Sequence, residues 1–148
     1  MLRSLLADAD HDAQTASLQR DGGRAFVSQS LRPYLLAALL DQESERPAIV
    51  VAGDDRAARD LAAALKTWLE PRTVRYYPSR GVTYESHLAP PPHLVGLRIA
   101  ALDALLDEDA AAAPVVVVSA VALSEKVPDP ALRPHGFELR TAELLDLD

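Results

Sequence analysis

The chain has 148 residues, of which 49% are hydrophobic and 25% are charged, and its net charge is −7. This length fits one domain with a buried core, and the composition is that of an ordinary globular protein. The acidic charge disfavours nonspecific binding to nucleic acid. Because the chain has no cysteine, disulfides, thiolate catalysis and cysteine zinc sites are excluded.

Targeting and membrane signals are weak in this sequence. The apolar run Leu2–Ala7 is short and is soon followed by Asp8, Asp10 and Asp12, so we expect no signal peptide. No apolar segment approaches the length that spans a bilayer, so we expect no membrane partner. The four histidines lack ligand spacing, and we expect no metal site. The expected compartment is the cytoplasm.

The first elements are predicted from short patterns. Residues 1–23 indicate a helical extension that ends at a pair of glycines. The compact apolar run Ala25–Val27 predicts a strand. Ser30 is placed to cap the next helix, which continues through Leu40, and Pro33 falls in the first turn of that helix, where a missing N–H does no harm.

A stronger strand signal follows Pro47. The run Ala48–Gly53 is continuously apolar, which is typical of a strand buried on both faces of a parallel sheet. Asp54 or Asp55 is placed to cap the next helix, where an acidic residue also suits the helix dipole. One face of that helix is apolar at steps of three and four residues: Ala58, Leu61, Ala62, Leu65, Trp68 and Leu69.

A third strand is predicted over Thr73–Tyr77, and a long polar loop follows it. The loop ends in Pro90–Pro92, which can begin a helix but cannot continue inside one. A helix is predicted over Leu94–Leu106. Val115–Val118 is the clearest strand of the chain.

The last part of the chain gives weaker signals. Ser119 is placed to cap a short helix over Ala120–Lys126. Residues 127–136 carry three prolines and indicate a loop. Phe137–Thr141 is a candidate for one more strand.

Strand and helix alternate four times in this prediction, which indicates an α/β fold. We expect a parallel sheet of about four to five strands with helices on both faces. In such sheets, ligands bind at the carboxyl ends of the strands. Those ends are predicted at Ser28 and Gln29, at Gly53 and Asp54, in the loop after Tyr77, and at Ser119.

The turn after the first predicted strand lacks the residues of a phosphate-binding loop. Such a loop needs glycines, whose N–H groups point inward, and a lysine that reaches the outer phosphates. Residues Val27–Pro33 contain neither glycine nor lysine, and Arg32 cannot replace the missing backbone cradle. We expect no cofactor here, and Ser28, Gln29, Ser30 and Arg32 form a degenerate phosphate-loop slot.

The acidic pair Asp54 and Asp55 raises a second hypothesis. Receiver domains carry such a pair after their first strand for Mg²⁺, and they also need an acceptor aspartate at the end of the third strand. Here the next strand ends in Tyr77, Pro78 and Ser79, without a carboxylate. Helix capping is the simpler interpretation, and a stand-alone receiver-like or nucleotide-binding switch domain is the alternative.

Two further candidates for chemistry are isolated. Glu85 and His87 could form a general acid/base pair, but no strained nucleophile motif accompanies them, and we expect no catalytic residue. Arg72, Arg75 and Arg80 could form a small nucleic-acid surface with neighbouring tyrosines. The acidic total favours a solvated face instead.

Arg98 is more informative, because it lies on the apolar stripe of its helix. A charged residue on such a stripe is seldom buried without partners. Its guanidinium is placed to donate hydrogen bonds to carbonyls of the loop over residues 76–92, or to Glu85. That arrangement would fix the loop from beneath; in the alternative, Arg98 borders the stripe and reaches water along its stem.

Four stretches in this order resemble one protein family: SLRPYLLAALL, RPAIVVAGDDRAARDLAAALKTWL, YYPSRGVTYESHLAPPPHLVGLRIAALDALL and PVVVVSAVALSEKVPDP. Over about residues 20–130 they look like the N-terminus of the bacterial transcription-repair coupling factor (Mfd), a region that is itself similar to the first domain of the excision-nuclease subunit UvrB.

Particular positions carry this resemblance. Five of them fit the run that follows the third strand in the family: Pro78, Tyr84, Ala89-Pro90 and Arg98. Val115–Leu123 fits its next strand and small-residue helix. Gly81 departs from the pattern, because many members carry a bulkier acidic residue there.

The resemblance implies a helicase-like (P-loop NTPase-like) topology with a degenerate phosphate loop. It implies a UvrB-like α/β domain over residues 24–135, an N-terminal helical extension over 1–23, and the start of a connection to the next domain over 136–148. UvrB carries a working phosphate loop and a tyrosine-rich hairpin that probes damaged DNA. The loop after Tyr77 is too short for that hairpin, which favours the coupling factor.

The implied function is non-catalytic. The domain would be a scaffold for recruiting the damage sensor UvrA, which binds the following domain, and for packing against the motor domains. RNA polymerase and DNA would be partners of the full-length protein, which in the family is an ATP-dependent DNA translocase. The structural or docking candidates within this domain are Arg98, Tyr84, Glu85, Arg80 and Tyr77.

Overall fold

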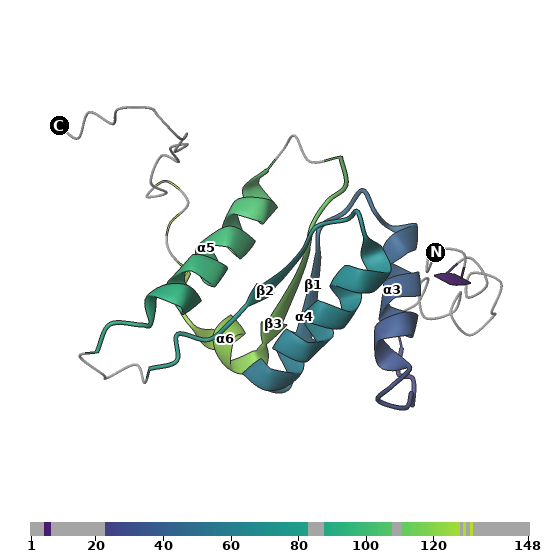
Figure 1. The fold of residues 1–148 in the computed structure, drawn as a ribbon, viewed down its shortest axis with the longest axis horizontal. Helices are drawn as coiled ribbons and strands as arrows, with labels where there is room; N and C mark the ends of the chain where they lie inside the picture. The colour runs from purple at the N-terminus through teal and green to yellow at the C-terminus, as the bar shows by residue number, and fades with distance from the viewer. Residues whose placement is uncertain are drawn as a thin grey trace, which may run out of the picture.

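The computed structural model describes residues 5–6, 23–82, 88–107, 111–127, 129 and 131. These residues form an α/β fold in which a three-stranded parallel sheet carries helices on both faces (Figure 1). In chain order the elements are α3 (Arg32–Gln42), β1 (Ala48–Ala52), α4 (Asp55–Leu69), β2 (Val74–Tyr77), α5 (Pro92–Leu106), β3 (Val115–Ser119) and α6 (Ala120–Ser124). The predicted α/β class, with a parallel sheet between helices, is therefore confirmed.

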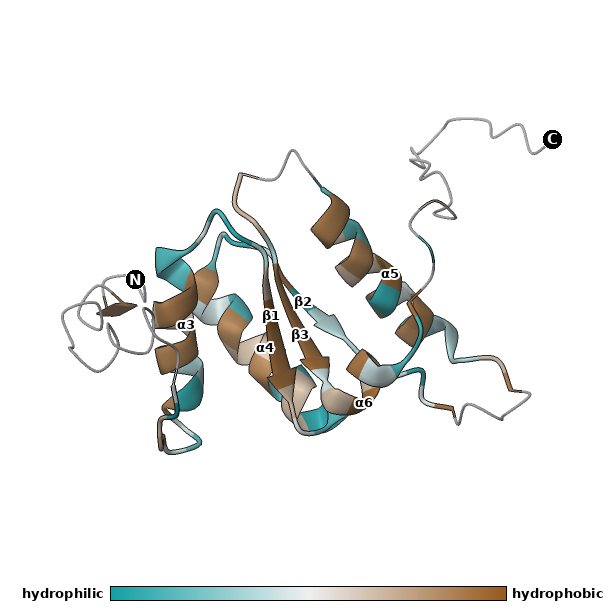
Figure 2. Cartoon of the chain, turned by 180° about the vertical axis from the view of Figure 1, so that it is seen from behind, coloured by the Kyte–Doolittle hydropathy of each residue, from teal (hydrophilic) through white to brown (hydrophobic). Residues whose placement is uncertain are grey.

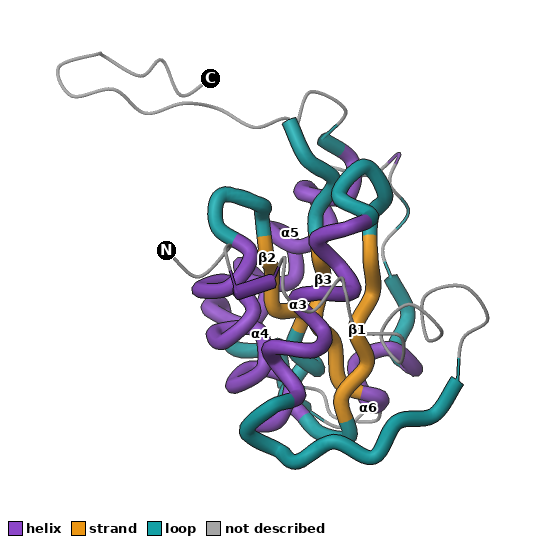
Figure 3. The backbone as a smooth tube through the Cα atoms, turned by 90° about the vertical axis from the view of Figure 1, so that its right-hand side faces the viewer, coloured by secondary structure: helices purple, strands orange, loops and turns teal. Residues whose placement is uncertain are grey.

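The strand order is β1-β3-β2, so β3 lies in the middle of the sheet (Figure 3). Ala48 of β1 and Val74 of β2 both align with Val115 of β3. Every residue of β3 is buried. Val115 and Val117 pack in the core beside α4, whereas Val116 and Val118 pack in the core beside α5 and α6.

The predicted count of four to five strands is not reached within the described residues, where the sheet has three. The prediction of a strand at Ala25–Val27 is wrong: these residues have no strand conformation, and Phe26 is fully exposed. A strand persists only where its N–H and C=O groups find partners, and a run of three apolar residues buries too little surface to secure one. Phe137–Thr141 and most of residues 1–23 lie outside the described parts of the chain.

β1 also differs from its prediction. Its apolar run was expected to be buried on both faces, but Ile49 is 59% exposed and Val51 is 51% exposed. β1 is an edge strand, and only Ala48, Val50 and Ala52 pack against the core beside α4. Figure 2 colours β1 and β3 alike as hydrophobic, so hydropathy does not separate an edge strand from a central one.

Two helix starts differ in how they are capped. The N-cap of α3 is Leu31, not the predicted Ser30, and no side chain caps this helix. The Ser30 hydroxyl instead lies 3.3 Å from the Ser28 hydroxyl. Pro33 falls in the first turn, as predicted. At α4 the Asp54 carboxylate accepts a 2.7 Å hydrogen bond from the Ala57 N–H, so Asp54 is the capping residue.

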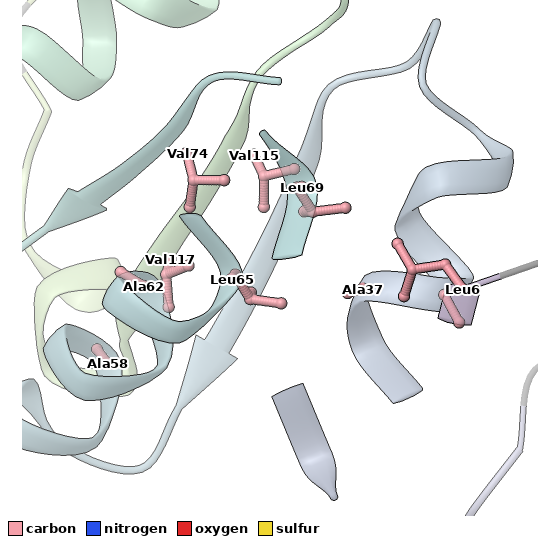
Figure 4. Packing of buried hydrophobic residues seen from close by; sticks show 10 residues of the cluster. Leu6, Ala37, Ala58, Ala62, Leu65, Leu69, Val74, Val115 and Val117 are labelled. Atoms are coloured by element: carbon pink, nitrogen blue, oxygen red, sulfur yellow. The ribbon is translucent and has the colours of Figure 1, made fainter. Parts of the chain in front are cut away.

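The larger core lies between the sheet and helices α3 and α4. The predicted apolar face of α4 is confirmed: Leu65 and Leu69 are buried against Val74 and Val115, and Trp68 contacts the ring of Tyr34 on α3. Leu6 joins this core beside Ala37 (Figure 4). The Tyr34 hydroxyl donates a 2.8 Å hydrogen bond to the Leu5 carbonyl, which ties these N-terminal residues to α3.

One buried guanidinium ties the amino-terminal side of the sheet together. Arg72, which is 4% exposed, donates 2.7 Å hydrogen bonds to the carbonyls of Ala113 and Arg46, and a third hydrogen bond to the Leu40 carbonyl. Ala113 lies just before β3, Arg46 lies just before β1, and Leu40 lies in the last turn of α3. The sequence predicted a solvated basic face made of Arg72, Arg75 and Arg80. For Arg72 this prediction is wrong, because its side chain is buried.

Candidate functional site at the carboxyl edge of the sheet

Asp55 connects the carboxyl ends of the strands. It is the first residue of α4, and two residues separate it from the end of β1. Its Oδ1 accepts a 3.1 Å hydrogen bond from the Ser79 N–H and a 2.7 Å bond from the Ser119 hydroxyl. Its Oδ2 accepts a hydrogen bond from the Ser79 hydroxyl. Since Ser79 follows β2 and Ser119 ends β3, the carboxylate joins all three strand ends; we call Asp55, Ser79 and Ser119 the carboxyl-edge network.

Neighbouring groups hold this network in place. The Tyr76 hydroxyl donates a 3.0 Å hydrogen bond to the Asp55 carbonyl. The Ser119 hydroxyl also accepts a 3.1 Å hydrogen bond from the Ala122 N–H, so the serine caps α6 as predicted while it binds Asp55. A hydroxyl can act as donor and acceptor at once, which is why serine suits this position.

The charge of Asp55 is stabilised by these donors. Burial alone would raise the pKa of the Asp55 carboxyl, but the hydrogen bonds from Ser79 and Ser119 together outweigh it and hold the pKa below its ordinary value. A carboxyl group whose folded-state pKa is lowered stabilises the fold above its unfolded-state pKa. That contribution is lost as the pH falls through the folded-state value.

Asp55→Asn is therefore expected to lower the free energy of unfolding at pH 7 by about 2 kcal/mol, since hydrogen bonds to a charged group contribute about 1.5–3 kcal/mol. The difference from the wild type should shrink as the pH falls below about 4, the ordinary carboxyl pKa. Chemical denaturation at neutral and acidic pH measures both quantities.

Asp54→Asn is the matched control, because asparagine caps helices about as well as aspartate. The control should stay near wild-type stability at neutral pH. If both variants lose the same stability, or if the loss in Asp55→Asn does not depend on pH, the role given to the Asp55 charge is wrong.

Arg98 supports the loop after β2 from beneath. Its side chain is 10% exposed, and its Nη1 donates a 2.8 Å hydrogen bond to the Pro78 carbonyl. The same nitrogen lies 2.6 Å from Oε2 of Glu125, which is 17% exposed. The guanidinium carbon lies 4.2 Å from the centre of the Tyr77 ring, so a cation–π contact adds to the ion pair. The hydrogen bond to a loop carbonyl was predicted for Arg98.

Glu125 is the partner that sequence reasoning missed. Its two carboxylate oxygens accept the Arg80 N–H at 3.0 and 3.1 Å, and Oε2 also accepts the bond from Arg98. The charge partner proposed from sequence, Glu85, lies outside the described residues. Glu125 follows a short helix that was predicted to continue past it, so no periodic pattern marked this residue.

The other docking candidates have different environments. Tyr77 is 5% exposed, and burial raises the pKa of its phenol. Its hydroxyl has no hydrogen-bond partner among the described residues. Tyr77 therefore supports the site from within the fold, whereas the half-buried Arg80 reaches the surface. Tyr84 lies outside the described residues.

Gly81 is required by the backbone at its position. Its φ of +71° is in the left-handed region, and an added Cβ would lie 2.8 Å from Cδ1 of Leu94. The departure of this chain from the family pattern at Gly81 thus has a local reason: the loop turns tightly against the start of α5.

The degenerate phosphate-loop slot lies apart from this network. Ser28, Gln29, Ser30 and Arg32 are all exposed, and the Leu31 N–H donates a 3.0 Å hydrogen bond to the Ser28 carbonyl in a turn. No strand leads into this turn, because residues 23–28 are irregular. The phosphate-loop slot was predicted at the end of a strand, and this prediction is wrong, because the residues before it form no strand.

The described residues contain neither a candidate metal site nor a helix that could cross a membrane. Within residues 23–82, 88–107 and 111–127, His, Asp and Glu form no cluster of three or more that could hold a metal ion. No helix in those same ranges is long and apolar enough to span a membrane. His93 is exposed, and His11, His87 and His135 lie outside the described residues.

Chemically, the polar groups at this edge are engaged with each other. The Asp55 carboxylate is used by Ser79 and Ser119, and the Arg98 guanidinium by Pro78 and Glu125. Such an arrangement holds the segments after β2 and after α6 in fixed positions at the surface of the protein.

Comparison of the chain with models of known families, with curated proteins and with solved structures finds no match.

Proposed function

We propose that this chain is the non-catalytic N-terminal α/β module of a transcription-coupled DNA repair factor. In this proposal the module docks against the motor domains of the same protein and supports recruitment of UvrA through the following domain. RNA polymerase and DNA are partners of the full-length protein, which works in the cytoplasm. The phosphate loop is degenerate within a helicase-like topology, and the module itself has no turnover and no cofactor.

The observation that carries the proposal is the use of polar groups at the carboxyl edge. In α/β proteins with activity, this edge presents free polar groups to a ligand. Here the described carboxylate, hydroxyls and guanidinium at the edge bind one another or nearby backbone groups. This mutual hydrogen bonding supports a structural role, in which the edge forms a docking surface, rather than a catalytic role.

Two motif positions of the resemblance also meet in space. Pro78 and Arg98 stand 20 residues apart in one matched run, and the Arg98 guanidinium donates to the Pro78 carbonyl at 2.8 Å. Ser119, in the fourth matched stretch, joins the carboxyl-edge network. A motif whose members contact each other supports the resemblance more than matches scattered over the chain.

The receiver-like alternative has less support. Its acidic pair is already engaged, since Asp54 caps α4 and Asp55 binds Ser79 and Ser119. We therefore propose the docking module alone.

Binding in trans tests the proposal. The purified chain is expected to bind a bacterial transcription-repair coupling factor that lacks its own first domain, as measured by biolayer interferometry. Arg80→Glu should weaken binding at least several-fold, because Arg80 lies on the loop that Arg98 and Glu125 hold. Lys66→Glu makes the same charge change on an exposed part of α4 and should leave binding unchanged. No binding, or equal weakening by both variants, would contradict the proposal.

A further inference from the structure

The outer edge of β1 presents backbone groups that no described residue uses. The Ala48 N–H donates to the Pro114 carbonyl, on the side of β3. In a parallel strand, backbone groups of alternate residues point to opposite edges. The N–H and C=O groups of Ile49 and Val51 therefore point away from β3. Among the described residues, no strand pairs with that edge.

The same two residues carry exposed apolar side chains. Ile49 is 59% exposed and Val51 is 51% exposed, on the face of the sheet that carries α5 and α6. Ile49 borders an apolar groove of about 140 Å³, lined also by Leu102, Leu123 and Val127. α5 packs mainly over β2, and Ile49 remains 59% exposed where it borders the groove.

Proteins protect such an edge with charged side chains, prolines or bulges. The strand AIVVA has none of these within its five residues. An unprotected, apolar edge strand pairs readily with another strand.

The sequence around β1 fits an antiparallel copy of itself. Pairing about a two-fold axis at Val50 puts Ile49 opposite Val51 of the second copy. These are the two residues whose N–H and C=O groups point outward, so each such pair exchanges both backbone hydrogen bonds. Registers shifted by two residues would place Pro47, which has no N–H, or Gly53 in these pairs.

Charge complementarity supports the same register. The axis at Val50 places Arg46 opposite Asp54 of the second copy, whose Oδ1 caps α4 while its charge remains available to a cation. The Arg46 side chain is 81% exposed, and its ion pair with Glu43 is long, at 3.8 Å. Glu45 comes opposite Asp55 of the second copy, whose carboxylate is already directed to Ser79 and Ser119. The cross-strand pairs Ile49–Val51 would also place apolar side chains together on one face.

We propose that the chain forms a symmetric dimer through antiparallel pairing of β1 with β1 of a second copy, which extends the sheet across both copies. This is a surface distinct from the carboxyl edge, and it does not depend on the proposed repair function. The apolar faces of Ile49 and Val51 from both copies meet at the two-fold axis, beside the groove that Ile49 borders.

The oligomeric state of the purified chain tests this proposal. Multi-angle light scattering should give twice the chain mass of 16.0 kDa, with dissociation on dilution over about a hundredfold range because pairing follows mass action. Val51→Lys should give a monomer at the same concentrations, because a lysine on an edge strand opposes pairing. Val121→Lys is the matched control: Val121 is 57% exposed, belongs to α6 rather than to β1 and does not line the groove, and this variant should remain a dimer.

Amide hydrogen exchange of the wild type provides a readout that does not depend on the variants. In the dimer, the amides of Ile49 and Val51 should exchange slowly and should become faster on dilution. A wild-type monomer at all concentrations would overturn the proposal. If the monomer's Ile49 and Val51 amides are slow, a segment of the same chain covers the edge; if they are fast, the edge is open. Equal loss of dimer in Val51→Lys and Val121→Lys would also overturn it, since general apolar association would then explain the dimer.

Discussion

Arg72→Met is expected to lower the free energy of unfolding by about 4.5 kcal/mol, because three partly buried hydrogen bonds from a charged donor are lost together and each contributes about 1.5 kcal/mol, the lower end of the range for such bonds. The carbonyls of Ala113, Arg46 and Leu40 would lose their shared donor. These groups belong to segments that are far apart in the sequence, so the variant should loosen the joint between α3 and the starts of β1 and β3. Urea denaturation measures the loss.

Arg75→Met is the matched control for this prediction. Arg75 is three residues farther along, on an exposed position of β2, and the substitution is chemically the same. Exposed substitutions without special partners change stability by about 0.5 kcal/mol or less. Similar losses in the two variants would show that Arg72 contributes no more than a surface arginine does.

Arg98→Met is the second substitution with a large expected effect. It should lower the free energy of unfolding by about 3 kcal/mol, the lower end of the range for breaking a buried ion pair, because Glu125 remains 17% exposed. The Pro78 carbonyl would also lose its donor. The loop after β2 should become more accessible, so trypsin should cleave after Arg80 faster in this variant than in the wild type.

A double-mutant cycle separates the pair from its surroundings. Arg98→Met combined with Glu125→Leu removes both charges, so the double variant should be more stable than the sum of the two single losses predicts. If the two losses simply add, the Arg98–Glu125 pair carries no coupling. Unchanged tryptic cleavage after Arg80 in Arg98→Met would contradict the loop-anchoring role itself.

How far the sequence predicts this structure depends on whether a residue stands in a periodic pattern. Arg98 stands on the apolar stripe of a long helix, so its burial and its bond to a loop carbonyl were predictable. Arg72 is also buried, but it lies in a turn after Pro71 and has no periodic neighbours. Its three partners come from distant segments, and only the folded chain brings them together.

The sequence also does not predict which strand lies in the centre of the sheet. Ala48–Gly53 and Val115–Val118 both predict buried strands, and both are strands. Which one lies in the centre depends on pairing between distant segments, and local hydropathy does not record it. The acidic pair also could not be resolved from the sequence, because Asp54 and Asp55 were equally good candidates for the helix cap. Only the folded chain brings Ser79 and Ser119 to Asp55 and so gives the two aspartates different roles.

The central proposal is that the polar groups at the carboxyl edge hold the fold rather than bind a nucleotide. Thermal unfolding of the wild-type chain with increasing ATP and Mg²⁺ tests it most directly. A ligand at about 100 times its dissociation constant stabilises a protein by about 2.7 kcal/mol, which raises the melting temperature by several degrees. The account predicts no shift in the melting temperature. A saturable rise of several degrees, abolished by Arg32→Ala or Asp55→Asn, would contradict it.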